Sequence, residues 1–196
     1  MFPGVILWPE IKPVTALVAP SLARGVGLGS PSRPPTIPFA GEYWLFRWPY
    51  LRPPPNSYFQ RGTPSALFFS STDRVPLQME AHHKLERSIS MFCCRRIEVA
   101  ILNADRHPGT IALELFLVDS KQPNARQSLG RSPVNSVPDL MADRPQPVPE
   151  TLDFLFPSAP RLDQFDEIKL IFRRAVERVD KSARISIEKF VLTPAE

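Results

Sequence analysis

The sequence is poor in the residues that build metal sites and disulfide frameworks. It holds 2 cysteines, which are adjacent, and 3 histidines among 196 residues. Two thiols cannot complete a tetrahedral zinc site, and one pair of neighbours makes no disulfide framework. Because neighbouring side chains on a strand point to opposite faces, we expect Cys93 and Cys94 on opposite faces rather than joined in the rare vicinal disulfide. We therefore expect no metal and no cofactor.

Long apolar runs and the common catalytic motifs are also missing. No run of about 18 apolar residues could cross a membrane as a helix, and no basic segment precedes an apolar run as in a signal peptide. The sequence contains no GxSxG, Walker or GxGxxG motif. The 24 Lys and Arg exceed the 20 Asp and Glu only slightly and are scattered, whereas a nucleic-acid surface needs clustered charge. We expect neither an enzyme nor a nucleic-acid partner.

Proline is the residue in excess. The chain has 24 prolines against 8 glycines, and the usual share of proline is only about 5%. Many prolines separate apolar runs, where they end strands and stiffen loops, so long helices are not expected. Four prolines between residues 31 and 38 predict an extended linker. We therefore divide the chain into a Pro-rich, apolar arm and linker over residues 1–40 and a folded domain over residues 41–196.

Period-2 alternation of apolar side chains predicts that this domain is built from strands. It is clearest over residues 96–120, where two alternating runs flank a turn rich in Asn, Asp, Pro and Gly. We interpret the two runs as one long central hairpin. Residues 77–87 fit either a short helix or an irregular edge strand, and residues 121–150 predict a long loop. Further strands are expected over residues 41–48, 66–71, 89–94, 152–156, 168–173 and 185–192.

The closing segments resemble a known group of domains. SARISIEKFVLTP is similar to the last strand of jelly-roll carbohydrate-binding modules and galactose-binding-like domains, where an apolar strand carries a central acidic residue. Its expected pairing with FDEIKLIFRR, and the long central hairpin, also look like such domains. Over residues 41–194 the resemblance implies an all-β, two-sheet antiparallel β-sandwich of jelly-roll type with little helix, which agrees with the strand pattern.

A second resemblance concerns the setting of the protein. The runs FSSTDRVPLQMEA, IEVAILNADRHPGTIALELFLVDS and DKSARISIEKFVL are similar to the soluble portion of uncharacterised bacterial proteins that carry membrane segments before it. This implies a membrane-associated protein of the cell envelope, tethered only through sequence absent from this chain. Neither resemblance brings a catalytic residue with it.

The aromatic residues around the first expected strand suggest a ligand site. Trp48 and Tyr50 flank a proline at its end, and Tyr58 follows. Sugar rings present apolar C–H faces on which flat aromatic side chains stack. Asp105 and His107 share the central turn and could bind a ligand or act as an acid–base pair, although turn chemistry alone also explains Asp105. We predict a ligand-binding site that contains Trp48, Tyr50, Tyr58, Asp105 and His107.

Other polar or aromatic groups have simpler interpretations. On the first strand the alternation favours Trp44, Phe46 and Trp48 as core residues, which competes with a ligand platform at Trp48. His82 and His83 lack the HExxH spacing and a third ligand, so we expect a surface pair.

Two acidic residues sit on the runs of the central hairpin. Glu98 and Glu114 could be cross-strand neighbours there, and we expect them on a solvated face rather than as the acid pair of a glycosidase.

Two functions follow from these patterns. The first is a non-catalytic binding module for a glycan at the cell envelope, in which the aromatic residues and the loop over residues 121–150 form the site. The alternative is a protein-interaction or assembly domain without a small-molecule ligand, in which the apolar arm packs on the sandwich.

Overall fold

The protein is described by a computed structural model over residues 5–8, 34–47, 58–61, 77–122, 125–139, 141, 146–175, 178 and 184–195. In these ranges the regular elements are strands and none is a helix, so the described residues offer no helix that could cross a membrane. The strands are β1 (Val5–Trp8), β2 (Thr36–Pro38), β3 (Glu42–Arg47), β4 (Tyr58–Arg61), β5 (Leu77–Ser90), β6 (Cys94–Asn103), β7 (Ile111–Val118), β8 (Arg126–Pro133), β9 (Val148–Leu155), β10 (Gln164–Arg174) and β11 (Ile185–Pro194).

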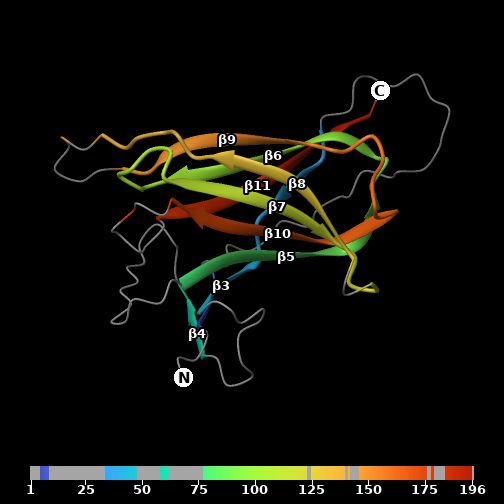
Figure 1. Ribbon diagram of the computed structural model, residues 1–196, viewed down its shortest axis with the longest axis horizontal. Coiled ribbons are helices and arrows are strands. Elements are labelled where there is room, and N and C mark those ends of the chain that lie inside the picture. Colours follow the sequence, from blue (N-terminus) through green and yellow to red (C-terminus); the bar gives the residue numbers. More distant parts are fainter. Residues whose placement is uncertain are drawn as a thin grey trace.

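These strands form two sheets that pack face to face, which confirms the predicted all-β sandwich (Figure 1). The larger sheet has the order β4-β1-β3-β5-β10-β7-β8, and the smaller has the order β2-β11-β6-β9. Neighbours are antiparallel except β1 and β4, which are parallel. When β2 and β5 to β11 are numbered one to eight along the chain, the sheets read 1-8-3-6 and 2-7-4-5. This is the strand order of a jelly roll, and β3, β1 and β4 extend one of its sheets.

The predicted central hairpin is wrong. β6 pairs with β11 and β9 in the smaller sheet, whereas β7 pairs with β10 and β8 in the larger one. The turn over residues 104–110 therefore crosses between sheets. Alternation reveals that a strand has a buried face but not which strand it pairs with, because partner choice depends on long-range contacts. For the same reason Glu98 and Glu114 are not cross-strand neighbours: Glu98 contacts Arg96, and Glu114 accepts a 2.7 Å hydrogen bond from Arg173.

The two closing strands are also not partners. We expected the segments that form β10 and β11 to pair, yet β10 lies between β5 and β7 in the larger sheet and β11 lies between β2 and β6 in the smaller. The chain leaves one sheet after β10 and enters the other. Both segments are apolar on one face, so either pairing satisfies their patterns.

β5 replaces the predicted short helix or edge strand. It is a 14-residue strand in the interior of the larger sheet, between β3 and β10. Its inward positions are occupied by Met79, Ala81 and His83. Because one of these inward residues is a polar histidine, the sequence does not show a clear alternation of apolar and polar residues. The two histidines are not a surface pair, because His83 is buried against the core and His82 is mostly covered on the outer face. The expected strand over residues 89–94 is interrupted: residues 89–90 end β5, residues 91–93 form a turn, and residue 94 begins β6.

The expected long loop over residues 121–150 contains β8 and the first residues of β9, which begins at Val148. β8 covers residues 126–133 and pairs with β7 at the edge of the larger sheet. Its sequence is polar, so it lacks the alternation that marks a half-buried strand. A register shift opposite Leu115 and Phe116 adds one residue to β8, and Gly130 beside it has φ +102°, a conformation that favours glycine.

On β3 the buried aromatic residue is Tyr43, not Trp44. The Tyr43 side chain is fully buried, and its hydroxyl accepts a 2.8 Å hydrogen bond from the backbone N–H of Ile187 in the opposite sheet. Burial raises the pKa of the Tyr43 phenol. Trp44 is half-buried on the outer face. Because both faces of β3 are aromatic, hydrophobic contrast could not decide which one faces the core. The side chains of Phe46 and Trp48 lie outside the described residues.

The cysteines depart from the prediction as well. Cys93 and Cys94 form a disulfide. Alternation places neighbouring side chains on opposite faces only within a strand, but β5 ends at Ser90 and β6 begins at Cys94, so Cys93 belongs to the turn. A turn frees the two side chains from pointing to opposite faces.

In the described residues, two strands precede residue 41. β2 lies within the stretch expected to be a linker and pairs with β11, and β1 pairs with β3. The expected strand over residues 66–71 lies outside the described residues. The boundary of the domain at residue 41 stays a prediction.

Candidate functional site

Of the predicted site residues, those that the structure describes lie on β4, an edge strand of the larger sheet, and in the turn before β7, the second strand from the opposite edge. Tyr58 is the first residue of β4, while Asp105 and His107 lie in the turn that leads into β7. Trp48 and Tyr50 lie outside the described residues and follow β3 in the sequence. The expectation that these five residues bind a ligand stays a prediction. The strand pairing of the larger sheet shows how far β3 and β4 lie from β7.

One row of paired residues crosses the larger sheet from β4 to β7. Tyr58 pairs with Val5, and the row continues through Leu45, Met79, Phe172 and Leu113. Tyr58 and the turn before β7 therefore lie toward the same end of the sheet. With about 4.8 Å between strands, β7 is about 14 Å from β3 and about 24 Å from β4. The sheet aligns these segments along one end without bringing them into contact.

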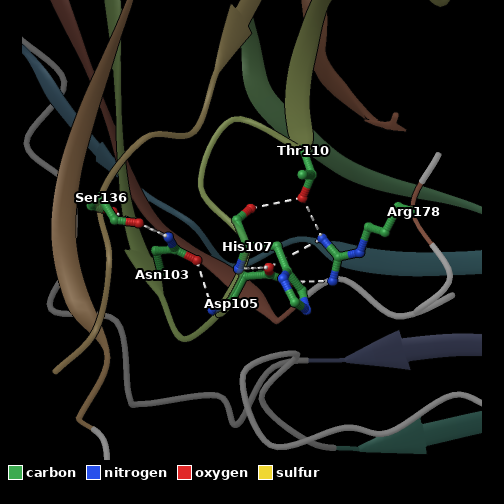
Figure 2. Close-up of polar contacts among 6 residues, drawn as sticks. All are labelled: Asn103, Asp105, His107, Thr110, Ser136 and Arg178. Atoms are coloured by element: carbon green, nitrogen blue, oxygen red, sulfur yellow. Dashed lines mark hydrogen bonds and ion pairs between the residues drawn. The ribbon is translucent and has the colours of Figure 1, made fainter. Parts of the chain in front are cut away.

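The turn between β6 and β7 is fixed by a chain of hydrogen bonds, which Figure 2 shows. The Asn103 side chain accepts from the Asp105 N–H at 2.8 Å and donates to the Ser136 carbonyl at 2.7 Å. Asp105 Oδ1 accepts from the His107 N–H at 2.9 Å, and the Thr110 hydroxyl donates to the His107 carbonyl at 2.7 Å. These are the local side-chain bonds that Asn, Asp and Thr supply in turns. They define the backbone path of the turn.

A buried ion pair completes the turn. Arg178 donates from Nη1 to Asp105 Oδ1 at 3.1 Å and from Nη2 to Oδ2 at 2.6 Å, and Nη1 also donates to the Thr110 hydroxyl at 3.0 Å (Figure 2). The side chains of Arg178 and Asp105 are 3% and 4% exposed. A planar guanidinium matches a carboxylate in this two-point contact. Both Asp105 oxygens are therefore bound within the fold.

A second carboxylate ties the neighbouring loop to the same place. Glu150, on β9, accepts hydrogen bonds from the backbone N–H groups of Asn135 and Ser136, both at 3.0 Å. Its Oε2 also accepts from the Ser136 hydroxyl at 2.6 Å. Since Asn103 donates to Ser136, the turn over residues 104–110 and the loop after β8 form one connected polar network. The hydrogen bonds of this network fix the backbone on both sides of His107, whose side chain is exposed.

A second polar cluster, which sequence reasoning missed, lies on the outer face of the larger sheet. His82 Nδ1 is 2.6 Å from Glu167 Oε1, and His82 Nε2 is 2.9 Å from Glu80 Oε2. Lys169 Nζ lies 2.6 Å from the same Glu80 oxygen. The Trp44 ring stacks on the His82 ring with centroids 4.2 Å apart. We call these five residues the outer-face cluster.

In the outer-face cluster, neighbouring groups stabilise the charged forms of His82 and Glu80. Burial alone would lower the pKa of His82, but hydrogen bonds to Glu167 and Glu80 raise it above its ordinary value. Burial alone would raise the pKa of Glu80, but the hydrogen bond to His82 and the charge of Lys169 keep it below its ordinary value. The cluster thus places the His82 ring between two carboxylates. The described residues contain no group of three that could hold a metal ion.

The signal for this cluster was present but weak. Glu80 and His82 are two positions apart on one strand, and Glu167 and Lys169 are two positions apart on another, so each pair shares a face. Sequence alone could not place β5 beside β10, where Lys169 pairs with His82.

The comparisons with known proteins assign no family to this chain. No family model matches the sequence, and the comparison with curated proteins finds no match. Among solved structures, the chain is similar to the coat protein of tobacco streak virus, with 11% sequence identity and a TM-score of 0.24. That alignment covers 65% of this chain and 92% of the coat protein. We draw nothing about function from a similarity at this level.

Proposed function

We propose that the chain is a non-catalytic binding module for an oligosaccharide, and that the ligand lies along the end of the larger sheet that carries the turn over residues 104–110. The observation behind the proposal is the rigid polar network that presents His107. Sites built from fixed polar groups lose little freedom when they bind, which favours recognition of flexible sugars. An imidazole can both donate to and accept from sugar hydroxyls.

The spacing of the strands suggests the size of the ligand. Trp48 and Tyr50 follow β3, which is about 14 Å from β7, and Tyr58 begins β4, about 24 Å from β7. A ligand that contacts aromatic residues at one side and His107 at the other needs several sugar rings. The binding of both Asp105 oxygens by Arg178 favours a structural rather than an acid–base role for this carboxylate.

A glycan array probed with the full chain tests this proposal, with oligosaccharides of the cell envelope as first probes. Binding is then measured by titration calorimetry for wild type, Trp48→Ala and His107→Ala. Loss of a stacked aromatic side chain is expected to weaken binding by about tenfold or more, which corresponds to about 1.4 kcal/mol. Phe92→Ala is the matched control. Phe92 is exposed in the turn after β5, at the opposite end of the larger sheet from the turn over residues 104–110. A folded protein that binds no glycan would overturn the proposal.

An assembly domain is the second candidate, and exposed apolar side chains favour it. Phe92 is 65% exposed and Leu155 is 70% exposed, and Leu155 pairs with Arg96 close to the start of β6. Exposed large apolar side chains mark interaction surfaces when they gather. Light scattering after size-exclusion chromatography separates the candidates. If wild type self-associates and Phe92→Asp does not, the assembly function is supported. If the protein stays monomeric at every concentration tested and binds no protein partner, the assembly function is contradicted.

A further inference from the structure

The disulfide between Cys93 and Cys94 lies in the turn that joins β5 to β6. We propose that it is a redox site, which accepts two electrons from a dithiol reductant and switches the turn between a cross-linked and an open form. Three features support this role: the size of the loop that the bond closes, the hydrogen bonds around it and the burial of the two cysteines.

The loop closed by this bond is the smallest that a disulfide can close. A disulfide stabilises a protein mainly by restricting the unfolded chain, and this effect grows with the length of the closed loop. Adjacent residues are already close in the unfolded chain, so the bond contributes little to global stability. A structural cross-link would join distant segments, and this one does not.

Hydrogen bonds, in addition to the disulfide, connect the turn to the rest of the fold. Met91 N–H donates to the Asp163 carbonyl at 2.9 Å, and Cys93 N–H donates to the Ser90 carbonyl at 3.2 Å. The Phe92 N–H donates to the Ser90 hydroxyl at 3.2 Å. Ala195 N–H donates to the Cys93 carbonyl at 3.0 Å, which ties the chain after β11 to the turn. We therefore expect the reduced protein to keep its fold.

The two sulfurs differ in access. Cys94 is 8% exposed and belongs to the hydrophobic core, whereas Cys93 is half-buried and packs at the edge of that core beside exposed Phe92. A reductant therefore reaches Cys93 first. After reduction, the Cys94 thiol is a small apolar side chain in a core position, which proteins tolerate well.

The reaction balances as an ordinary thiol–disulfide exchange. A thiolate of the dithiol attacks Cys93 Sγ, which forms a mixed disulfide and releases Cys94 as a thiolate that takes up a proton. The second thiol of the reductant then attacks the sulfur of its own first thiol. Cys93 leaves as a thiolate and is protonated, and the reductant departs as a cyclic disulfide. Two electrons and two protons pass to the protein.

The test uses the full chain, oxidised in air, with and without dithiothreitol under native conditions. Alkylation followed by mass spectrometry should count no free thiol before reduction and two after it, while circular dichroism stays unchanged. Amide hydrogen exchange should become several-fold faster at Cys93 and Ala195 and stay the same at Ile97 and Val99, which lie within β6. General destabilisation would accelerate all four amides, so this pattern separates a local switch from a loss of fold.

Two further arms identify the chemistry. Glutathione, a monothiol, should leave its adduct on Cys93 and an alkylatable thiol on Cys94, as peptide mapping would show. The double variant Cys93→Ser/Cys94→Ser should exchange like the reduced protein whether or not dithiothreitol is present. The proposal is wrong if the oxidised protein already carries two free thiols, if the disulfide resists dithiothreitol until the protein unfolds, or if the adduct lies on Cys94.

Discussion

Single side chains decide how the two sheets meet, and Tyr43 is the best example. Its hydroxyl, buried in the core, accepts the backbone N–H of Ile187 from the opposite sheet. Without this hydroxyl, the N–H of Ile187 would face an apolar ring. The alternation favours Trp44, Phe46 and Trp48 as the core side of the first strand, because a local pattern does not show that a buried N–H needs an acceptor.

We expect Tyr43→Phe to lower the free energy of unfolding by about 1–3 kcal/mol, because it leaves a buried donor unsatisfied while it preserves ring packing. Urea denaturation followed by circular dichroism measures the change. Phe92→Leu, at an exposed position, is the control and should stay within about 0.5 kcal/mol of wild type. Equal stability of Tyr43→Phe and wild type would show that the hydrogen bond contributes nothing.

The adjacent histidines should respond to pH with opposite signs. The pKa of His82 is raised in the folded protein, so its contribution to stability is fully present below the unfolded value of about 6.5 and is lost as pH rises through the folded pKa. Burial lowers the pKa of His83, so the folded state loses stability as pH falls below about 6.5.

Unfolding free energies from pH 5.5 to 9 test this for wild type, His82→Gln and His83→Gln. The advantage of wild type over His82→Gln should shrink as pH rises, and the stability of wild type relative to His83→Gln should fall as pH drops. Glu80 does not reverse the first trend, because its lowered pKa keeps its contribution present until the pH falls well into the acid range. Parallel profiles for the two variants would contradict the assignment.

At the scale of elements, the turn over residues 104–110 shows how local and distant interactions combine. The sequence predicted a turn here from its Asn, Asp, Pro and Gly content, and the hydrogen bonds of Asn103 and Asp105 to nearby N–H groups confirm the physical reason. Arg178 is 73 positions from Asp105, so nothing local indicated that the turn would also contain a buried ion pair.

We expect Asp105→Ala to destabilise the protein by about 3–5 kcal/mol, since removing one member of a buried ion pair leaves a buried charge. Chemical denaturation gives the value. His107→Ala, with an exposed side chain in the same turn, is the control and should change stability little. A loss below about 1 kcal/mol for Asp105→Ala would mean that water or other groups compensate for the carboxylate.

At the scale of the whole molecule, the connections between strands alternate between the sheets. Among the described strands from β5 to β11, only β7 and β8 are consecutive in the chain and also neighbours in a sheet, and every other connection in that range crosses from one sheet to the other. The strands of one sheet therefore cannot all pair unless the strands of the other sheet also reach their positions. Such non-local pairing slows folding, because loops must close before contacts form.

We expect unfolding to be a single cooperative transition for the sandwich, in which circular dichroism and tryptophan fluorescence report coincident denaturation curves. Refolding should be slow, on a millisecond-to-second time scale, for the same topological reason. Stopped-flow refolding and equilibrium urea curves measure both. Separate transitions for the two probes would indicate that one part of the protein unfolds independently.

The sequence by itself determined the class of the fold and much of the core. Runs of alternating apolar residues placed β6, β7, β9 and β10, and Ile97, Leu113 and Ile168 are buried as the alternation predicts. This works because the period of two is a local property of any strand with one buried face. Where polar side chains occupy inward positions, as in β5, or where a strand lies at an edge, as in β8, the pattern fades.

Only the tertiary structure decided which strands are neighbours and which polar groups meet. The division of β6 from β7, the outer-face cluster and the contact of Asp105 with Arg178 all depend on segments far apart in the sequence. The register of β11 is similar: a shift between Ile187 and Lys189 moves the inward face, so that Phe190 becomes buried. Local patterns report burial, whereas partner, register and charge pairing follow from how the whole chain fills one core.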